Sequence, residues 1–230
     1  IFSEPVCPGT SLGNFSEEFK AEAGFDSEVV FCPSHDTASA VAACPVGDNG
    51  VYISSGTWSL IGTENLFPVL SEKAQTANFA NEGGVGTIRF LKNIMGLWLI
   101  QESKRQWKRE GEELSFNELE QQAREAAPFE SFIDPDYPAF QTPGNMPKRI
   151  REYCEKTGQK VPETKGEIIR CIAQSLAFKY RQTVEGMEDV TGNKYSVINI
   201  VGGGIKDKMI CQFTANATKR VVSAGPVEAT

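Results

Sequence analysis

Several features are scarce in this sequence of 230 residues, and each scarcity excludes a class of protein. The apolar runs fall well short of the roughly eighteen residues that a membrane-spanning helix needs. The first residues show neither a charged n-region nor an apolar h-region, so we identify no secretory signal and expect a cytoplasmic protein. The composition is that of a globular chain, which excludes the collagen-like and disordered classes.

Positive charge is also in short supply. The chain has 23 Lys and Arg against 30 Asp and Glu, which gives a net charge of -7, and no basic cluster stands out. We therefore expect no nucleic acid and no anionic membrane as a partner. A phosphate group could still bind where backbone amides or a metal ion hold it.

Metal ligands are few, because His35 is the only histidine and no C-x-x-C pair occurs. A zinc site would lack its usual ligands, and we expect no metal site made by protein side chains. We favour reading the six cysteines as buried or half-buried thiols of a cytosolic protein, with a disulfide framework as the alternative. They are Cys7, Cys32, Cys44, Cys154, Cys171 and Cys211.

Two familiar phosphate-binding motifs are missing as well. The sequence contains no G-x-x-x-x-G-K-[ST], and the run Gly202-Gly203-Gly204 is not followed by the third glycine of G-x-G-x-x-G. A nucleotide would therefore need another architecture.

What is present is an alternation of apolar strands, glycine-bearing turns and helices, which predicts an α/β fold with helices on both faces of a sheet. The expected strands are 29–34, a hairpin over 51–63, 87–91, 195–201 and 219–222, with turns at Gly47–Gly50 and Gly225-Pro226. The expected helices are 38–44 (stopped by Pro45), 93–110, helical pieces within 111–165, a long amphipathic helix over 165–191, and 206–217.

Asp36 follows the first predicted buried strand and directly precedes a helix. Ligands of open α/β sheets bind at that edge, so Asp36 could take a proton from a substrate hydroxyl, with His35 as a substrate contact. The alternative is structural, because Asp is a preferred N-cap residue and His35 could be an ordinary turn residue.

Three other features each have a functional and a structural interpretation. Thr57, at a hairpin bend after Gly56, offers a phosphate nest or an ordinary turn. The glycine run lets a ligand approach the backbone or merely loosens a helix entry. Asn93 and Gln101 are polar residues in an apolar helix half, where a buried amide needs a protein or ligand partner. The tryptophans Trp58, Trp98 and Trp107 are most simply core or half-core aromatics.

Several segments carry a specific resemblance to a known family. They are 34–41 (SHDTASAV), 54–60 (SSGTWSL), 81–84 (NEGG), 91–99 (LKNIMGLWL), 201–204 (VGGG) and 224–230 (AGPVEAT). Together they resemble the FGGY carbohydrate kinases, and the first and fourth are typical of the rhamnulokinase subfamily. The resemblance extends from about residue 30 to residue 230.

The resemblance implies an actin-like (ribonuclease H-like) ATPase lobe with a mixed sheet, helices on both faces and a helical insertion at about 111–165. Residues 1–230 would form the C-terminal nucleotide-binding lobe, and the N-terminal sugar lobe and the last helix would be absent.

It also implies roles for single residues. Asp36 would be the catalytic base, with His35 and Thr37 at the substrate. Thr57 would meet the ATP phosphates, and three further residues would bind the nucleotide: Asn93, Gln101 and Gly203. The chain departs from the family at Asp207, where an Asn near the adenine is common.

The implied activity is ATP- and Mg²⁺-dependent phosphorylation of L-rhamnulose at O1, in rhamnose catabolism. Alternatives are a kinase for another ketose such as L-fuculose, or a nucleotide-binding lobe without turnover. The missing N-terminal lobe of the same protein would be a partner, and we expect the 230-residue chain alone to be inactive.

Cys154 and Cys171 are expected to lie close together and are a possible disulfide. Two helices joined by a short connection tend to pack antiparallel, which would place these residues opposite each other. The resemblance implies the same pairing.

Overall fold

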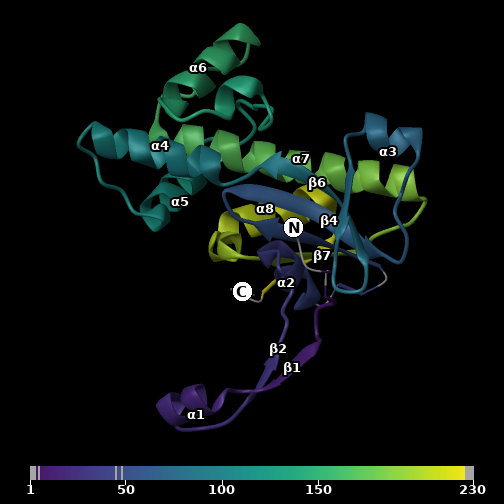
Figure 1. The fold of residues 1–230 in the computed structure, drawn as a ribbon. Coiled ribbons are helices and arrows are strands. Elements are labelled where there is room, and N and C mark those ends of the chain that lie inside the picture. Colours follow the sequence, from purple (N-terminus) through teal and green to yellow (C-terminus); the bar gives the residue numbers. More distant parts are fainter. Residues whose placement is uncertain (1–3, 5, 45, 48, 226–230) are drawn as a thin grey trace.

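The computed structural model describes residues 4, 6–44, 46–47 and 49–225, and a six-stranded mixed sheet lies at its centre (Figure 1). The strand order is β5-β6-β4-β3-β7-β8, in which β7 and β8 run parallel to β3 and the other neighbours are antiparallel. The strands are β3 (Gly50–Ser55), β4 (Trp58–Asn65), β5 (Ala80–Gly83), β6 (Ile88–Met95), β7 (Val197–Val201) and β8 (Val221–Ala224).

The hairpin predicted over 51–63 is confirmed. β3 and β4 pair antiparallel, and the last pair before the bend is Ser55 with Ser59. β3 also pairs with β7 on its other edge, so it lies in the middle of the sheet. Its side chains belong to core clusters on both faces, Val51 and Ile53 to one and Tyr52 to the other. Its nearly continuous burial agrees with the apolar run that predicted it.

Helices cover both faces of this sheet. One face is packed against a long helix and two neighbours, α7 (Lys165–Thr191), α8 (Lys208–Thr218) and α4 (Trp98–Arg109), and the main core lies between. On the other face a smaller cluster joins Val41 of α2 (Asp36–Ala42) to Tyr52 and Val201. These layers agree with the predicted α/β fold.

The prediction of α7 is also confirmed, and local chemistry sets both of its ends. The Thr164 hydroxyl oxygen accepts a hydrogen bond from the Glu167 amide, and the Glu167 carboxylate accepts one from the Thr164 amide. Gly192 ends the helix in the left-handed conformation at φ 74°. No helix of the described residues is long and apolar enough to cross a membrane.

The segment 111–165 is a helical insertion, as expected, and it packs at one end of the sheet (Figure 1). It contains α5 (Phe116–Glu125), the 3₁₀ turn η1 (Pro138–Phe140) and α6 (Met146–Lys156). Two further short elements are α3 (Glu72–Thr76) and η2 (Gly203–Lys206).

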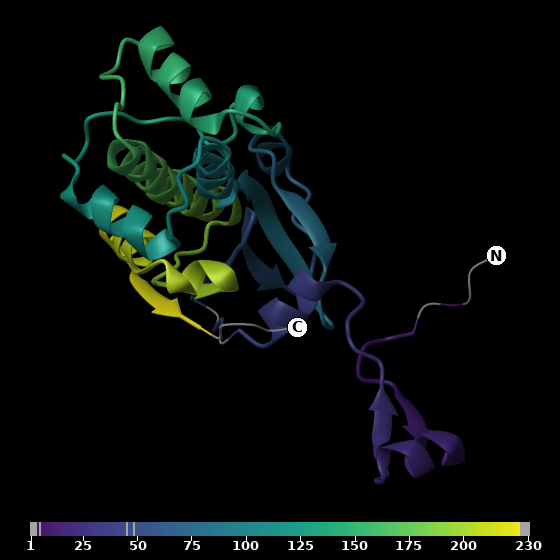
Figure 2. The same cartoon turned by 90° about the vertical axis from the view of Figure 1, so that its left-hand side faces the viewer.

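The prediction of a buried strand over 29–34 is wrong. This segment contributes only β2 (Glu28–Val30), which pairs with β1 (Ser11–Asn14) in a separate two-stranded sheet. With α1 (Glu17–Ala23) it forms an arm that projects from the body (Figure 2). The apolar run suits a strand, but Val30 and Phe31 are exposed there and not in the core.

The helix predicted from residue 93 is wrong at its start. β6 continues to Met95, because β4 pairs with it along its whole length and Leu60 lies opposite Asn93. The helix α4 begins only at Trp98. The ladder with β4 outweighs the local helix preference of this stretch.

α2 begins at Asp36, two residues before the predicted start, and ends at Ala42. The predicted stop at Pro45 and part of the turns at Gly47–Gly50 and Gly225-Pro226 lie outside the described residues.

Candidate functional site

A shallow hollow of about 410 Å³ lies where the start of α2 meets β4 and β6. Trp58 is 47% exposed there, so the prediction that it is a core or half-core aromatic is wrong for this tryptophan. Trp58 and Leu60 are two apart on β4 and therefore point to the same side of the strand. The lining residues are His35, Asp36, Thr37, Trp58, Leu60 and Asn93.

Asp36 presents its carboxylate to this hollow, and 78% of its side chain is exposed. The Thr37 amide donates a hydrogen bond to Oδ1 at 2.6 Å, and His35 Nδ1 lies 3.7 Å from the same oxygen. Asp36 is the first residue of α2 and His35 occupies the N-cap position, so the alternative reading of Asp36 as the N-cap is wrong. The carboxylate keeps one oxygen available to a ligand.

Thr57 and Gln101, both predicted to face the nucleotide, are brought together. The Thr57 hydroxyl donates to Gln101 Oε1 at 3.3 Å. Backbone bonds fix this bend against the start of α4, because the amides of Gly96 and Trp98 donate to the Thr57 carbonyl. The exposed hydroxyl therefore sits on a rigid corner between β3 and β4.

The glycine run lies at the same edge of the sheet, since β3 and β7 are parallel neighbours and their carboxyl ends meet there. Gly202 has φ +82°, and a Cβ on it would lie 3.0 Å from the Ser55 carbonyl oxygen. A Cβ on Gly204 would collide with the Ser55 hydroxyl, whereas one on Gly203 would meet open space. The backbone at Gly203 is thus accessible to a flat ligand, and its neighbours are glycines because Ser55 lies so close.

Asn93 was expected to be a buried amide. It is instead an exposed residue of β6. It lines the hollow that contains Asp36, and it lies opposite Leu60. Sequence reasoning missed Trp58 and Leu60 as lining residues, although their spacing of two within a predicted strand was a usable signal.

Asp207, the departure from the family pattern, is the N-cap of α8. Its side chain accepts a hydrogen bond from the Ile210 amide at 2.9 Å. Burial raises the pKa of this carboxyl above its ordinary value. Its helix-capping bond gives the residue a structural role at the end of the glycine run.

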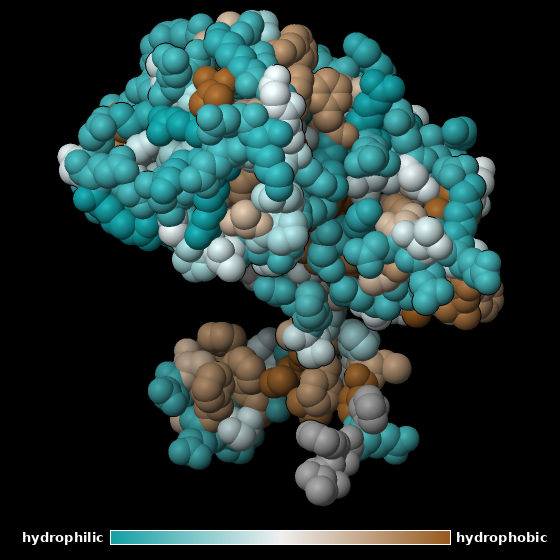
Figure 3. Space-filling model, turned by 90° about the horizontal axis from the view of Figure 1, so that it is seen from above, coloured by the Kyte–Doolittle hydropathy of each residue, from teal (hydrophilic) through white to brown (hydrophobic). Residues whose placement is uncertain are grey.

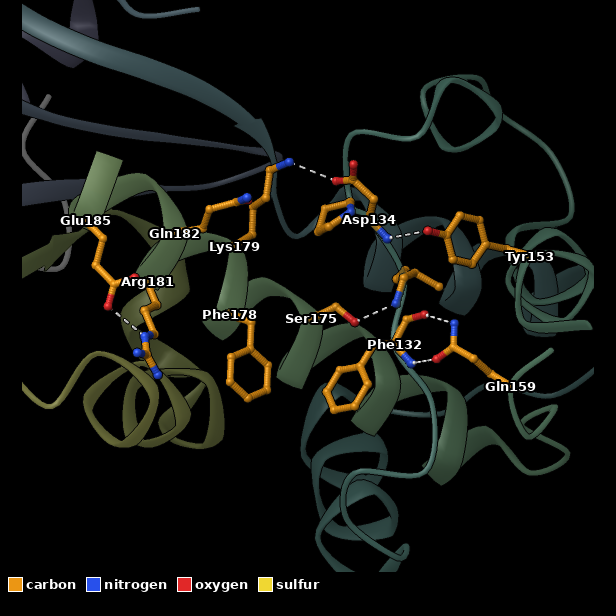
Figure 4. Close-up of a pocket in the computed structure, with 12 residues that line it drawn as sticks. Phe132, Asp134, Tyr153, Gln159, Ser175, Phe178, Lys179, Arg181, Gln182 and Glu185 are labelled. Atoms are coloured by element: carbon orange, nitrogen blue, oxygen red, sulfur yellow. Dashed lines mark hydrogen bonds and ion pairs between the residues drawn. The ribbon is translucent and has the colours of Figure 1, made fainter. Parts of the chain in front are cut away.

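A larger hollow, of about 690 Å³, contains none of the predicted site residues (Figure 4). Its charged groups are already paired, since Lys179 contacts Asp134 and Asp136 at 2.9 Å each and Arg181 contacts Glu185 at 2.8 Å. Within the part of the chain that the structure describes, no group of three acidic, histidine or cysteine side chains could hold a metal ion.

Cys154 and Cys171 are both buried and stand as free thiols. A hydrogen bond with Cys154, together with burial, raises the pKa of the Cys171 thiol. The close approach of the two sulfur atoms and their oxidation both stay predictions. Cys7 and Cys32 are exposed, so the prediction of buried or half-buried thiols is wrong for these two.

We expect mild oxidation to join Cys154 to Cys171, and a bridge closing a loop of about fifteen residues stabilises a protein by about 3 kcal/mol. Urea unfolding of the oxidised and reduced protein measures the gain, and peptide mapping identifies the bond. Cys154→Ser is the control, because it should remove the difference. Equal unfolding midpoints in wild type, with no bridged peptide, would contradict the prediction.

Comparison with known proteins adds an independent line of information. Residues 51–230 match the C-terminal domain of the FGGY family of carbohydrate kinases. The rhamnulokinase of Halalkalibacterium halodurans is 45% identical over 231 residues, covering 100% of this chain and 49% of that protein. The rhamnulokinase of Bacteroides thetaiotaomicron is 44% identical, covering 100% of this chain and 47% of that protein.

The fold has matches among solved structures too. The crystal structure of xylulose kinase from Rhodospirillum rubrum superposes with a TM-score of 0.66 at 14% identity, covering 97% of this chain and 45% of that one. This likeness agrees with the actin-like ATPase fold. The chain spans about half the length of the curated relatives it matches.

Proposed function

The chain belongs to the FGGY family of carbohydrate kinases, and from this membership we propose that the whole protein phosphorylates L-rhamnulose at O1 with ATP and Mg²⁺, in cytoplasmic rhamnose catabolism. The subfamily assignment is supported by relatives named rhamnulokinase that are 44–45% identical along the whole of this chain. In this proposal the chain is the C-terminal, nucleotide-binding lobe.

One observation carries the assignment of roles: the two halves of the candidate site adjoin each other on β4. Thr57 precedes Trp58 in the chain, and Trp58 lines the hollow that contains Asp36. A phosphate held at Thr57 would therefore lie next to a sugar hydroxyl held at Asp36. This adjacency is what direct phosphoryl transfer requires.

The residues of this chain position the reactants and move one proton. Asp36 accepts the proton of the attacking hydroxyl, and His35 and Thr37 line the sugar side with it. The Thr57 hydroxyl, oriented by Gln101, contacts the phosphates, and the backbone at Gly203 lies along the adenosine. Mg²⁺ bound together with ATP would neutralise part of the phosphate charge. Among the described residues, no group of three acidic, histidine or cysteine side chains could hold it.

We assign Asn93 to the sugar side rather than to the nucleotide. Its amide shares the hollow with Asp36, while Thr57 and Gln101 pair with each other. An amide at that point can donate to one sugar hydroxyl and accept from another.

The projecting arm supports an N-terminal lobe as the partner. α1 has no buried residue, and the apolar side chains of the arm stay exposed and gather on it (Figure 3). An isolated two-stranded sheet is marginal without a further layer. Half of the relatives' length lies outside the match and could cover these side chains, which are Val6, Leu12, Phe19, Phe25, Val30 and Phe31.

The substrate proposal is tested with the whole protein in a coupled ADP-release assay on a panel of ketoses. We expect kcat/KM for L-rhamnulose to exceed that for L-fuculose by at least tenfold, because contacts to ring substituents differ between the two sugars. A reversed ratio would identify an L-fuculose kinase. ATP binding without turnover on any ketose would indicate a non-catalytic nucleotide-binding lobe.

A further inference from the structure

A second pocket, of about 530 Å³, lies between α7, α8 and the loop that follows α5. It combines three aromatic rings with three cationic side chains, and no carboxylate is among its lining residues. The rings are Phe129, Phe178 and Phe213, and the cations are Arg170, Arg181 and Lys219. None of these residues belongs to the site proposed for sugar and ATP.

The backbone is strained at this pocket. Among the described residues only Asn78, Phe129 and Lys219 have positive φ without being glycine, and the last two both line the pocket. Phe129 has φ +63°, which is costly for a bulky residue, yet its ring is 65% exposed. The strain therefore holds an aromatic ring at the pocket rather than in the core. Strained residues of this kind cluster at ligand sites.

One hydrogen bond and one helix end fix the rim of the pocket in this shape. The Phe129 amide donates to Gln174 Oε1 at 3.1 Å, so a buried side chain of α7 holds the strained loop. Lys219 is strained because it ends α8 in the left-handed conformation. No ion pair between described residues involves Lys219, which leaves its charge available to a ligand.

The other two cations are anchored on α7. Arg170 donates to the carbonyls of Ala123 and Arg124 at 3.0 and 3.1 Å, its guanidinium lies 5.4 Å from the Phe213 ring, and its Nε is buried without a partner. Figure 4 shows Phe178 and Arg181 projecting from the same side of α7, with Glu185 already paired to Arg181. The pocket thus has a surplus of positive charge beside flat apolar faces.

We propose that this pocket binds a small aromatic molecule that carries an anionic group. The rings of Phe129, Phe178 and Phe213 would stack against the flat part, and Lys219 and Arg170, which have no carboxylate partner among the described residues, would contact the anion. The sugar-kinase assignment could fail without affecting this proposal, because the two sites share no residue.

The probe is 8-anilinonaphthalene-1-sulfonate, titrated into the whole protein and followed by its fluorescence. Both strained positions permit well-behaved variants, since glycine adopts positive φ freely. We expect Lys219→Gly to weaken the dissociation constant about five- to tenfold through the lost charge, and Phe129→Gly about fivefold through the lost ring. Both variants should melt at or above the wild-type temperature.

Asn78→Gly is the matched control, because it relieves the same kind of strain outside the pocket and should leave the dissociation constant unchanged. The neutral analogue N-phenyl-1-naphthylamine, which lacks the sulfonate, should bind at least fivefold more weakly to wild type and should not distinguish Lys219→Gly. Retention of wild-type affinity for the sulfonate in both pocket variants would overturn the proposal. Equal binding of the two probes to wild type would overturn its anionic part.

Discussion

In the whole protein, Asp36→Asn should lower kcat by about two to four orders of magnitude while ATP still binds, which is the usual range for loss of a general base. The amide keeps the size of the carboxylate and can still accept the hydrogen bond from the Thr37 amide. It cannot accept the proton of the attacking hydroxyl. Steady-state kinetics with L-rhamnulose, together with a nucleotide-binding titration, separates the two effects.

Asp189→Asn is a suitable control, because Asp189 is an exposed carboxylate paired with Lys73 on another part of the surface. This variant should keep wild-type kinetics. If Asp36→Asn retains more than about a tenth of wild-type kcat, Asp36 is not the base. A loss of ATP binding in the same variant would instead indicate that Asp36 organises the nucleotide side.

The 230-residue chain by itself should show no turnover of L-rhamnulose and ATP. The hollow beside Asp36 is shallow and open, and in the described part of the chain its lining comes from α2 with its N-cap His35, from β4 and from β6. Holding both reactants in a productive orientation lowers the barrier by about 7–11 kcal/mol. Contacts to only one side of the sugar cannot hold it in that orientation. Closure around both reactants is also what keeps water from taking the phosphoryl group.

The measurement is a coupled ATP-consumption assay of the 230-residue chain and the whole protein at equal concentration. Circular dichroism and a melting curve of the shorter chain serve as the control that it is folded. Turnover at even a hundredth of the whole protein's rate would contradict the two-lobe requirement. Turnover restored by adding the other half as a separate chain would support it.

The sequence by itself determined the elements in which local chemistry and burial agree. The long helix over 165–191 and the hairpin over 51–63 were predicted correctly, because a periodic apolar face and a glycine-bearing bend both act over short distances. The motifs likewise indicated the family, because a string such as SHDTASAV can be matched to it without knowing which residues are in contact.

Tertiary structure decided the rest. Asn93 was predicted in a helix because its neighbours are apolar, but the ladder between β6 and β4 keeps it in a strand and turns it toward Asp36. The run 29–34 looked like a core strand, yet its partner is β1 in the projecting arm. The pocket at Phe129 depends on a loop held by Gln174, 45 residues away in the chain. Pairing register and long-range hydrogen bonds are properties of the folded chain, which is why no window of sequence reveals them.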